Sequence, residues 1–198
     1  MICFAMLTMM VSCTPKRIEI PTYEGMDPLT VLAKNDNVSS IQTTFSIEYD
    51  RDGRIMKGDA ALRMTPEALN LYVYSLGFLV AEITSDNNTV KSRPPLEKNK
   101  LEILVDGLRS SFFWWSIKDP DIRDYRDSYY IFNSWKKLLV DKKTMMPEKQ
   151  LVELDGNREL SVLYKNPDLI DGIWFPSEMQ ISLSRYSVRL KVKTLSFN

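Results

Sequence analysis

The sequence predicts an α+β fold that is mostly β: a curved antiparallel sheet of about ten strands, forming a half-open barrel with two helices as a lid. Most of the chain alternates apolar and polar residues with period two, and two stretches instead follow helical spacing. Two helices cannot cover so many strands unless the sheet curls around them. With 198 residues, 44% of them hydrophobic, the chain can bury one core without disulfides or a structural metal.

A short helix and a meander of strands open the domain. We expect Asp27 to cap the helix, because Pro28 stands at the first-turn position that proline tolerates. Apolar and polar residues then alternate, which indicates strands with one solvent-exposed face. The sequence Asp50-Arg51-Asp52-Gly53 supplies the first hairpin turn. Four strands are expected in this part, over residues 41–49, 56–64, 69–73 and 80–85.

A second helix interrupts the sheet. Arg93-Pro94-Pro95 ends the strand pattern. Apolar residues then follow the spacing of an amphipathic helix, at Leu101, Leu104, Val105, Leu108 and Phe112. The acidic stretch 119–127 is expected to be a solvated loop or hinge. Six more strands follow, over residues 129–132, 137–141, 150–154, 160–164, 175–184 and 187–197.

Composition narrows the classes of function. The chain has 26 basic and 26 acidic residues, and this balance argues against general binding of nucleic acids. It has no histidine, which excludes Ser-His-Asp and Cys-His sites and histidine-ligated zinc. Acidic pairs such as Asp50 and Asp52 stand in turns, where aspartate is favoured for local hydrogen bonding. We therefore expect no enzyme, no cofactor and no metal site, and rank a histidine-free carboxylate hydrolase last.

The N-terminus predicts processing and lipid attachment. Residues 2–11 are apolar and uncharged but far shorter than the roughly 20 residues of a spanning helix, so residues 1–12 are interpreted as a signal peptide. Val11-Ser12-Cys13 resembles the lipobox of bacterial lipoproteins. The resemblance implies lipidation of Cys13, a lipidated tether over residues 13–26 and anchoring to the periplasmic side of the outer membrane. The alternative is a short buried N-terminal segment.

Several segments carry a second resemblance: 57–63 with 69–74, the loop Ser75-Leu76-Gly77, 108–120 and 171–193. Their order resembles the LolA/LolB superfamily, the bacterial periplasmic carrier and outer-membrane receptor for lipoproteins. The resemblance implies that residues 27–198 form a monomeric domain that binds acyl chains and helps receive or insert lipoproteins. A periplasmic carrier protein is then an expected partner, and nucleic acid is not. The alternative is a lipoprotein of the same fold that carries another apolar ligand or acts as an envelope scaffold.

Candidate ligand-binding residues belong to the inner face of the predicted sheet and helix. An apolar cavity suits acyl chains, because burial contributes about 25 cal/mol per Å² and requires few polar partners. The alternative is that the same side chains fill a solid core. Arg63 is included because it resembles a basic position near the lid contacts of the LolA/LolB superfamily. The candidates are Phe45, Ile47, Leu62, Arg63, Leu71, Val73, Leu101, Leu104 and Leu108.

Leu76 is the candidate for contact with a membrane. It precedes Gly77 between two strands, and the family that the chain resembles presents an exposed leucine in that loop. If residues 76–80 form one continuous strand, Leu76 is buried instead. The run Phe112–Trp115 raises a similar alternative. Four consecutive aromatic residues cannot all face one core from a helix, so at least one is expected at a lid edge, a cavity mouth or a membrane, unless all simply pack.

Overall fold

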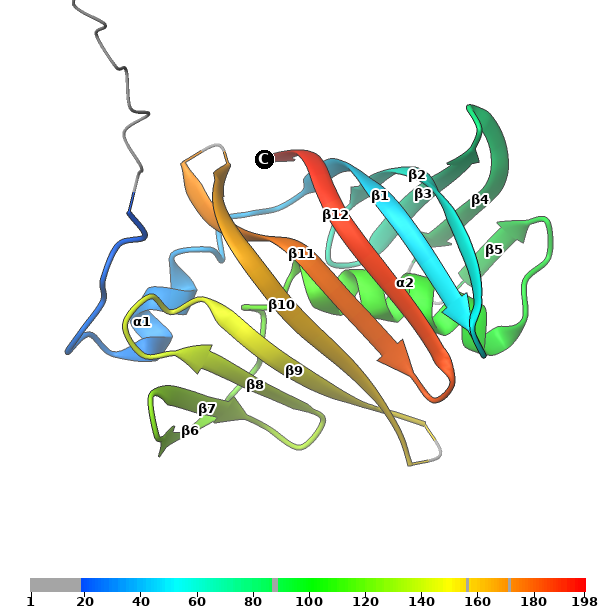
Figure 1. Ribbon diagram of the computed structural model, residues 1–198. Helices are drawn as coiled ribbons and strands as arrows, with labels where there is room; N and C mark the ends of the chain where they lie inside the picture. The colour runs from blue at the N-terminus through cyan, green and yellow to red at the C-terminus, as the bar shows by residue number, and fades with distance from the viewer. Residues whose placement is uncertain (1–18, 87–88, 156, 171) are drawn as a thin grey trace, which may run out of the picture.

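The computed structural model describes residues 19–86, 89–155, 157–170 and 172–198. Within these ranges, 12 strands form one antiparallel sheet that curves around a central helix without closing (Figure 1). The predicted mostly β class, with a half-open curved sheet and two helices, is therefore confirmed. The number of strands exceeds the expected ten by two.

The two helices are α1 (Pro28–Ala33) and α2 (Lys98–Phe112). The strands are β1 (Ile41–Arg51), β2 (Arg54–Met64), β3 (Ala68–Ser75), β4 (Phe78–Asp86), β5 (Thr89–Arg93), β6 (Asp121–Tyr125), β7 (Ser128–Phe132), β8 (Lys136–Asp141), β9 (Pro147–Leu154), β10 (Arg158–Ile170), β11 (Ile173–Leu183) and β12 (Tyr186–Phe197). Before α2, consecutive strands are neighbours in the sheet, and the same holds for the strands after α2. In addition, β1 pairs with β12. That last pairing joins the two halves of the chain into the sheet order β5-β4-β3-β2-β1-β12-β11-β10-β9-β8-β7-β6.

The two strands that the sequence analysis missed are the two edges of the sheet. β5 was not expected, and β6 lies within the stretch that was expected to be a loop. Each is five residues long, and four of the five side chains are exposed. A strand that buries neither face has no period-two alternation of apolar residues, so the pattern that located the other strands is missing here.

The helix cap and the first hairpin form where the local sequence predicted them. The Asp27 carboxylate accepts a hydrogen bond from the backbone N–H of Thr30 at 3.0 Å, so Asp27 caps α1 as predicted. In the first hairpin Ile47 lies opposite Gly58, and Tyr49 lies opposite Met56. Paired residues of an antiparallel sheet share a face, and these four belong to the concave face that α2 covers.

Helix α2 lies across the concave face and contacts β10, β11 and β12 (Figure 1). Its middle comes close to the sheet at Gly107. A Cβ atom at this position would lie 2.7 Å from Ile181 Cγ2, which is closer than side chains pack. Within the described ranges, neither helix is long and apolar enough to cross a membrane.

All four residues of the aromatic run are buried, as in the alternative that all simply pack, and Phe113 also lines a pocket beside α2. The helix ends at Phe112, and Phe113 has φ −100° and ψ 49°. Because the chain leaves helical geometry there, the four side chains are not confined to helical spacing and all reach the core. Phe112 stacks on Phe175 at 5.7 Å between ring centroids, and Trp114 meets Trp115 edge-on at 5.6 Å.

The predicted signal peptide 1–12, Cys13 and the first part of the tether lie outside the described residues. The rest of the tether precedes α1 on the left of Figure 1. There the backbone N–H of Tyr23 donates to the Lys143 carbonyl at 2.7 Å, and Lys34 Nζ lies 4.9 Å from the centre of the Tyr23 ring. The chain therefore contacts the domain before α1 begins.

Candidate functional site

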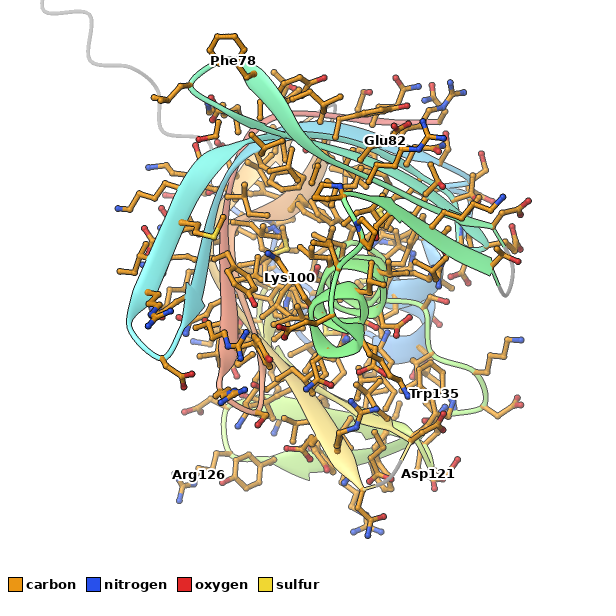
Figure 2. The ribbon with its side chains drawn as sticks, turned by 90° about the vertical axis from the view of Figure 1, so that its right-hand side faces the viewer. Phe78, Glu82, Lys100, Asp121, Arg126 and Trp135 are labelled. Carbon is orange, nitrogen blue, oxygen red and sulfur yellow. The ribbon has the colours of Figure 1, made fainter. Side chains whose placement is uncertain are left out.

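An apolar cavity of about 420 Å³ lies between the first four strands and the N-terminal half of α2. Figure 2 views the molecule from this side, with the β1–β2 hairpin beside the start of α2 and the β3–β4 hairpin above them. The volume falls within the range of about 300–1,000 Å³ that is typical of small-molecule sites. The lining residues are Ile47, Tyr49, Met56, Lys57, Gly58, Val73, Tyr74, Ser75, Val80, Ala81, Pro94, Leu96, Lys100 and Leu104.

Two local features shape the cavity. Gly58 has no side chain on the wall formed by β2, and a Cβ atom there would collide with the backbone carbonyl oxygen of Tyr74. The register of β3 and β4 shifts between Val73 and Tyr74, so Val80 has no partner in the ladder. Such a bulge bends its strand and re-aims side chains, and Val80 lies on the cavity wall.

The predicted ligand-binding residues divide into three groups. Ile47, Val73 and Leu104 line the cavity. Five others are packed in the core and do not line the cavity: Phe45, Leu62 and Leu71 of the sheet and Leu108 of α2 are buried, and Leu101 of α2 is half-buried against the core. Both alternatives therefore occur. The solid core and the cavity lie at opposite ends of the same apolar faces of the strands and of α2.

Arg63 lies on the other face of the sheet. It is exposed and pairs with Gln42 and Asn70, which are exposed as well. Because side chains alternate along a strand and Leu62 points inward, Arg63 must point outward. It does not line the cavity, contrary to the prediction that it is a ligand-binding residue there.

Several lining residues escaped the sequence analysis, although two signals point to them. Met56 and Tyr49 continue the period-two face of Ile47 toward the hairpin turn. Lys100 lies four residues before Leu104, on the same face of α2. Pro94 and Leu96 follow the end of β5 in a loop, and no periodic pattern identifies them.

Charged and aromatic residues surround the mouth. Lys100 Nζ lies 4.7 Å from the centre of the Tyr49 ring. Burial raises the pKa of Tyr49 to about 12, so its hydroxyl stays protonated at neutral pH. Glu97 accepts hydrogen bonds from Arg51 at 3.1 Å and from the Tyr186 hydroxyl at 3.1 Å. These bonds lower the pKa of Glu97, which is therefore a paired carboxylate at neutral pH.

Leu76 lies at the tip of the β3–β4 hairpin. β3 ends at Ser75 and β4 begins at Phe78, so residues 76–80 do not form one continuous strand. Leu76 and Gly77 have φ values of 51° and 83°, the positive values that a two-residue type I′ turn requires. The Leu76 side chain is 95% exposed and Phe78 is 76% exposed. Figure 2 shows Phe78 pointing away from the body of the molecule.

The exposed tip and the cavity are continuous. Leu79 and Val80, which follow Phe78, are exposed apolar residues too, and Val80 also lines the cavity. On the other strand Ser75 lines the cavity and is followed directly by Leu76. An apolar surface thus leads from the cavity wall to the end of the hairpin.

A second pocket, of about 480 Å³, lies along another face of α2 and has a more charged lining. Its most unusual member is Lys136, whose side chain is almost completely buried. Lys136 Nζ donates to the carbonyl oxygens of Ser116 at 2.7 Å and Phe113 at 3.3 Å. Burial lowers the pKa of this lysine to about 7. Lys136 therefore attaches the segment that directly follows α2 to β8.

Three solved structures share this fold. A LolA superfamily protein from Nitrosomonas europaea has a TM-score of 0.60 at 14% identity, over 87% of this chain and 94% of that chain. A putative outer membrane lipoprotein-sorting protein domain from Vibrio parahaemolyticus has a TM-score of 0.53 at 9% identity, over 86% and 91%. A DUF1329 family protein from Desulfovibrio piger has a TM-score of 0.50 at 9% identity, over 87% and 91%.

Comparison of the sequence with protein-family models gives no match, and comparison with curated proteins gives none either. The likeness therefore lies in the path of the chain and not in particular residues. This chain has the fold of a LolA superfamily protein, as the order of its sequence segments indicated.

Proposed function

We propose that this protein binds acyl chains in the cavity beside α2 and helps to receive or insert lipoproteins at the outer membrane. The observation that carries the proposal is the continuity between an apolar cavity and an exposed apolar hairpin tip. A protein that only stores a ligand needs the cavity alone. A protein that passes a chain to a bilayer also needs an apolar path by which the chain leaves.

The tip itself argues for a role outside the fold. A non-glycine residue in the left-handed conformation costs about 1–2 kcal/mol, and asparagine or glycine is preferred in such turns. Leu76 adopts this conformation while its side chain remains almost fully exposed. A leucine at this position contributes nothing to the core, so contact with lipid or a partner protein explains it better than stability does.

The anchor and the tip have different tasks in this proposal. Inserting the Leu76 side chain into a bilayer removes apolar surface worth about 2 kcal/mol, which biases a transient contact but does not hold a protein. Acyl chains on Cys13 would supply the standing attachment, on the periplasmic side of the outer membrane. A periplasmic carrier protein would deliver the cargo to the mouth of the cavity. The LolA superfamily protein and the lipoprotein-sorting domain that share the fold support this assignment.

The experiment measures the binding and the delivery of acyl chains separately. The variant Leu76→Glu should bind a fluorescent acyl probe with unchanged affinity and unfold at the same temperature, because the side chain packs against nothing. Its transfer of a bound lipoprotein to liposomes should fall severalfold, because a carboxylate opposes insertion.

Leu163→Glu is the matched control, since Leu163 is a partly exposed leucine on β10, far from the tip in sequence. It should leave both binding and delivery unchanged. A folded wild-type protein that takes up no acyl probe would overturn the proposed cavity. Undiminished delivery by Leu76→Glu would overturn the role of the tip.

A further inference from the structure

One feature of the cavity points to the chemistry of a ligand. Its only charged lining residues in the described chain are two lysines, Lys57 and Lys100. Lys57 is neutralised by Glu48, at 2.9 Å between Nζ and a carboxylate oxygen. Among the described residues, Lys100 has no carboxylate within 4.0 Å and no hydrogen bond from its ammonium group, which lies over the face of the Tyr49 ring.

The acidic residues nearest to Lys100 in the sequence, Glu97 and Glu102, are already engaged. Glu97, three residues before Lys100, is held by Arg51 and Tyr186. Glu102 is held by Arg158 at 2.5 Å and lies 3.7 Å from Lys98. The three N–H donors of Lys100 are therefore left for a group that enters from outside.

The neutral hydroxyl group of Tyr49 adds a second hydrogen-bond donor to the cavity. Tyr49 lines the cavity below Lys100, and because burial raises its pKa to about 12 it remains an O–H donor at neutral pH. An ammonium group and a phenol hydroxyl both donate hydrogen bonds, and the ammonium group cannot accept one. The remainder of the lining is mostly apolar, as an alkyl chain requires.

We propose that the cavity binds single-chain anionic amphiphiles, with the alkyl chain against Ile47, Val73 and Leu104 and the anionic head at Lys100. The shared chemistry is a carboxylate or a phosphate on one alkyl chain. Figure 2 shows Lys100 at the start of α2, on the side of the helix toward the β1–β2 hairpin. Lys100 is half-buried, so a head group bound there would remain in contact with water. This inference rests on the proposed acyl-binding cavity and adds a free ligand class to it.

The test compares four ligands that have alkyl chains of the same length and different head groups. Calorimetry of the full chain is performed with dodecanoate, dodecyl phosphate, 1-dodecanol and dodecyltrimethylammonium, each below its critical micelle concentration. Matched melting curves establish that each variant is folded. Wild-type protein should bind the two anions about tenfold more tightly than the alcohol, because charge-assisted hydrogen bonds exceed neutral ones. Dodecyltrimethylammonium should bind more weakly than the alcohol.

The variant Lys100→Gln should lose about tenfold in affinity for both anions and keep its affinity for the alcohol. Lys98→Gln is the matched control, because Lys98 lies in the same turn, carries the same charge and does not line the cavity. Lys98→Gln should change the affinity for the anions and the affinity for the alcohol by no more than about twofold.

The outcomes separate the two proposals. If folded wild-type protein binds none of the four compounds, the acyl-binding cavity itself is refuted. If the anions and the alcohol bind equally well, and Lys100→Gln changes neither, the cavity stands and the anionic head group is refuted. Equal losses for Lys100→Gln and Lys98→Gln would also refute it, since they would show a general effect of net charge.

Discussion

The buried lysine at the start of β8 predicts an unusual dependence of stability on pH. Lys136 is 2% exposed, and burial lowers its pKa from 10.5 to about 7. Between these values the unfolded chain keeps the proton that the folded protein releases. The unfolded state therefore binds more protons, and the free energy of unfolding rises with pH in this window. From about pH 7 to about pH 9 the rise contributed by Lys136 is about 2 kcal/mol.

The variant Lys136→Met isolates this contribution. It keeps a long apolar stem and has no titrating group, so the difference in unfolding free energy between pH 7 and pH 9 should shrink by about 2 kcal/mol. The stability of the variant at one pH is a weaker measure, because relief of the buried charge is offset by two carbonyl oxygens that lose their donor. Lys137→Met is the control, since Lys137 lies partly exposed beside Glu153 and its pKa is raised.

Urea titrations at pH 7, 8 and 9 provide the assay, and the quantity compared is the unfolding free energy of each protein at each pH. This range lies below the titration of tyrosine. Burial raises the pKa of Tyr49 and of Tyr164, so those residues lower stability only above about pH 10, where the unfolded chain loses phenol protons first. If Lys136→Met and wild type show the same slope from pH 7 to 9, then Lys136 is not held in a buried site and α2 is not attached in the way described.

Three further predictions concern the cavity, the helix and the anchor. Leu104→Glu should lower the unfolding free energy by about 3–5 kcal/mol and weaken acyl binding, because it places an unpaired carboxylate on a buried wall. Urea titration and binding of the acyl probe measure the two effects. Leu104→Met is the control and should lower the unfolding free energy by less than about 1.5 kcal/mol. Gly107→Ala should destabilise by about 1 kcal/mol in urea titration, because overpacking against Ile181 outweighs the gain in helix propensity; a gain of about 1 kcal/mol would contradict the close approach. Mass spectrometry of the N-terminal peptide should show acylated Cys13 and no residues 1–12, and Cys13→Ser should release the protein from membranes; an unmodified Cys13 would remove the basis for anchoring.

Local chemistry made most of the fold predictable. The alternation from Ile41 to Tyr49 located β1 because one face of that strand is buried and the other is exposed. Asp27 and Pro28 located the start of α1, since capping depends on neighbours in the chain. Even Lys136 follows the inward alternation with Leu138 and Val140, so its burial was present as a pattern, although a lysine is seldom assigned to the core.

The site was only partly predictable, because apolar spacing does not state how far apart two packed elements lie. Phe45 and Ile47 have the same inward position on β1, yet the first is core and the second is cavity wall. What separates them is the path of α2: Gly107 lets its middle approach the sheet, while the cavity lies between its N-terminal half and the first four strands.

The class of fold, the inward face of each central strand and the helix that covers them could be predicted from the residues alone, because these depend on periodicity and on residues close in the chain. The three-dimensional arrangement was needed to locate the two edge strands, the outward position of Arg63 and the exposure of Leu76. It was also needed to show that Lys100, at the cavity mouth, has no carboxylate partner among the described residues. The physical reason is that exposure, charge pairing and empty volume depend on distances between elements far apart in the chain, and residue spacing along one element does not specify those distances.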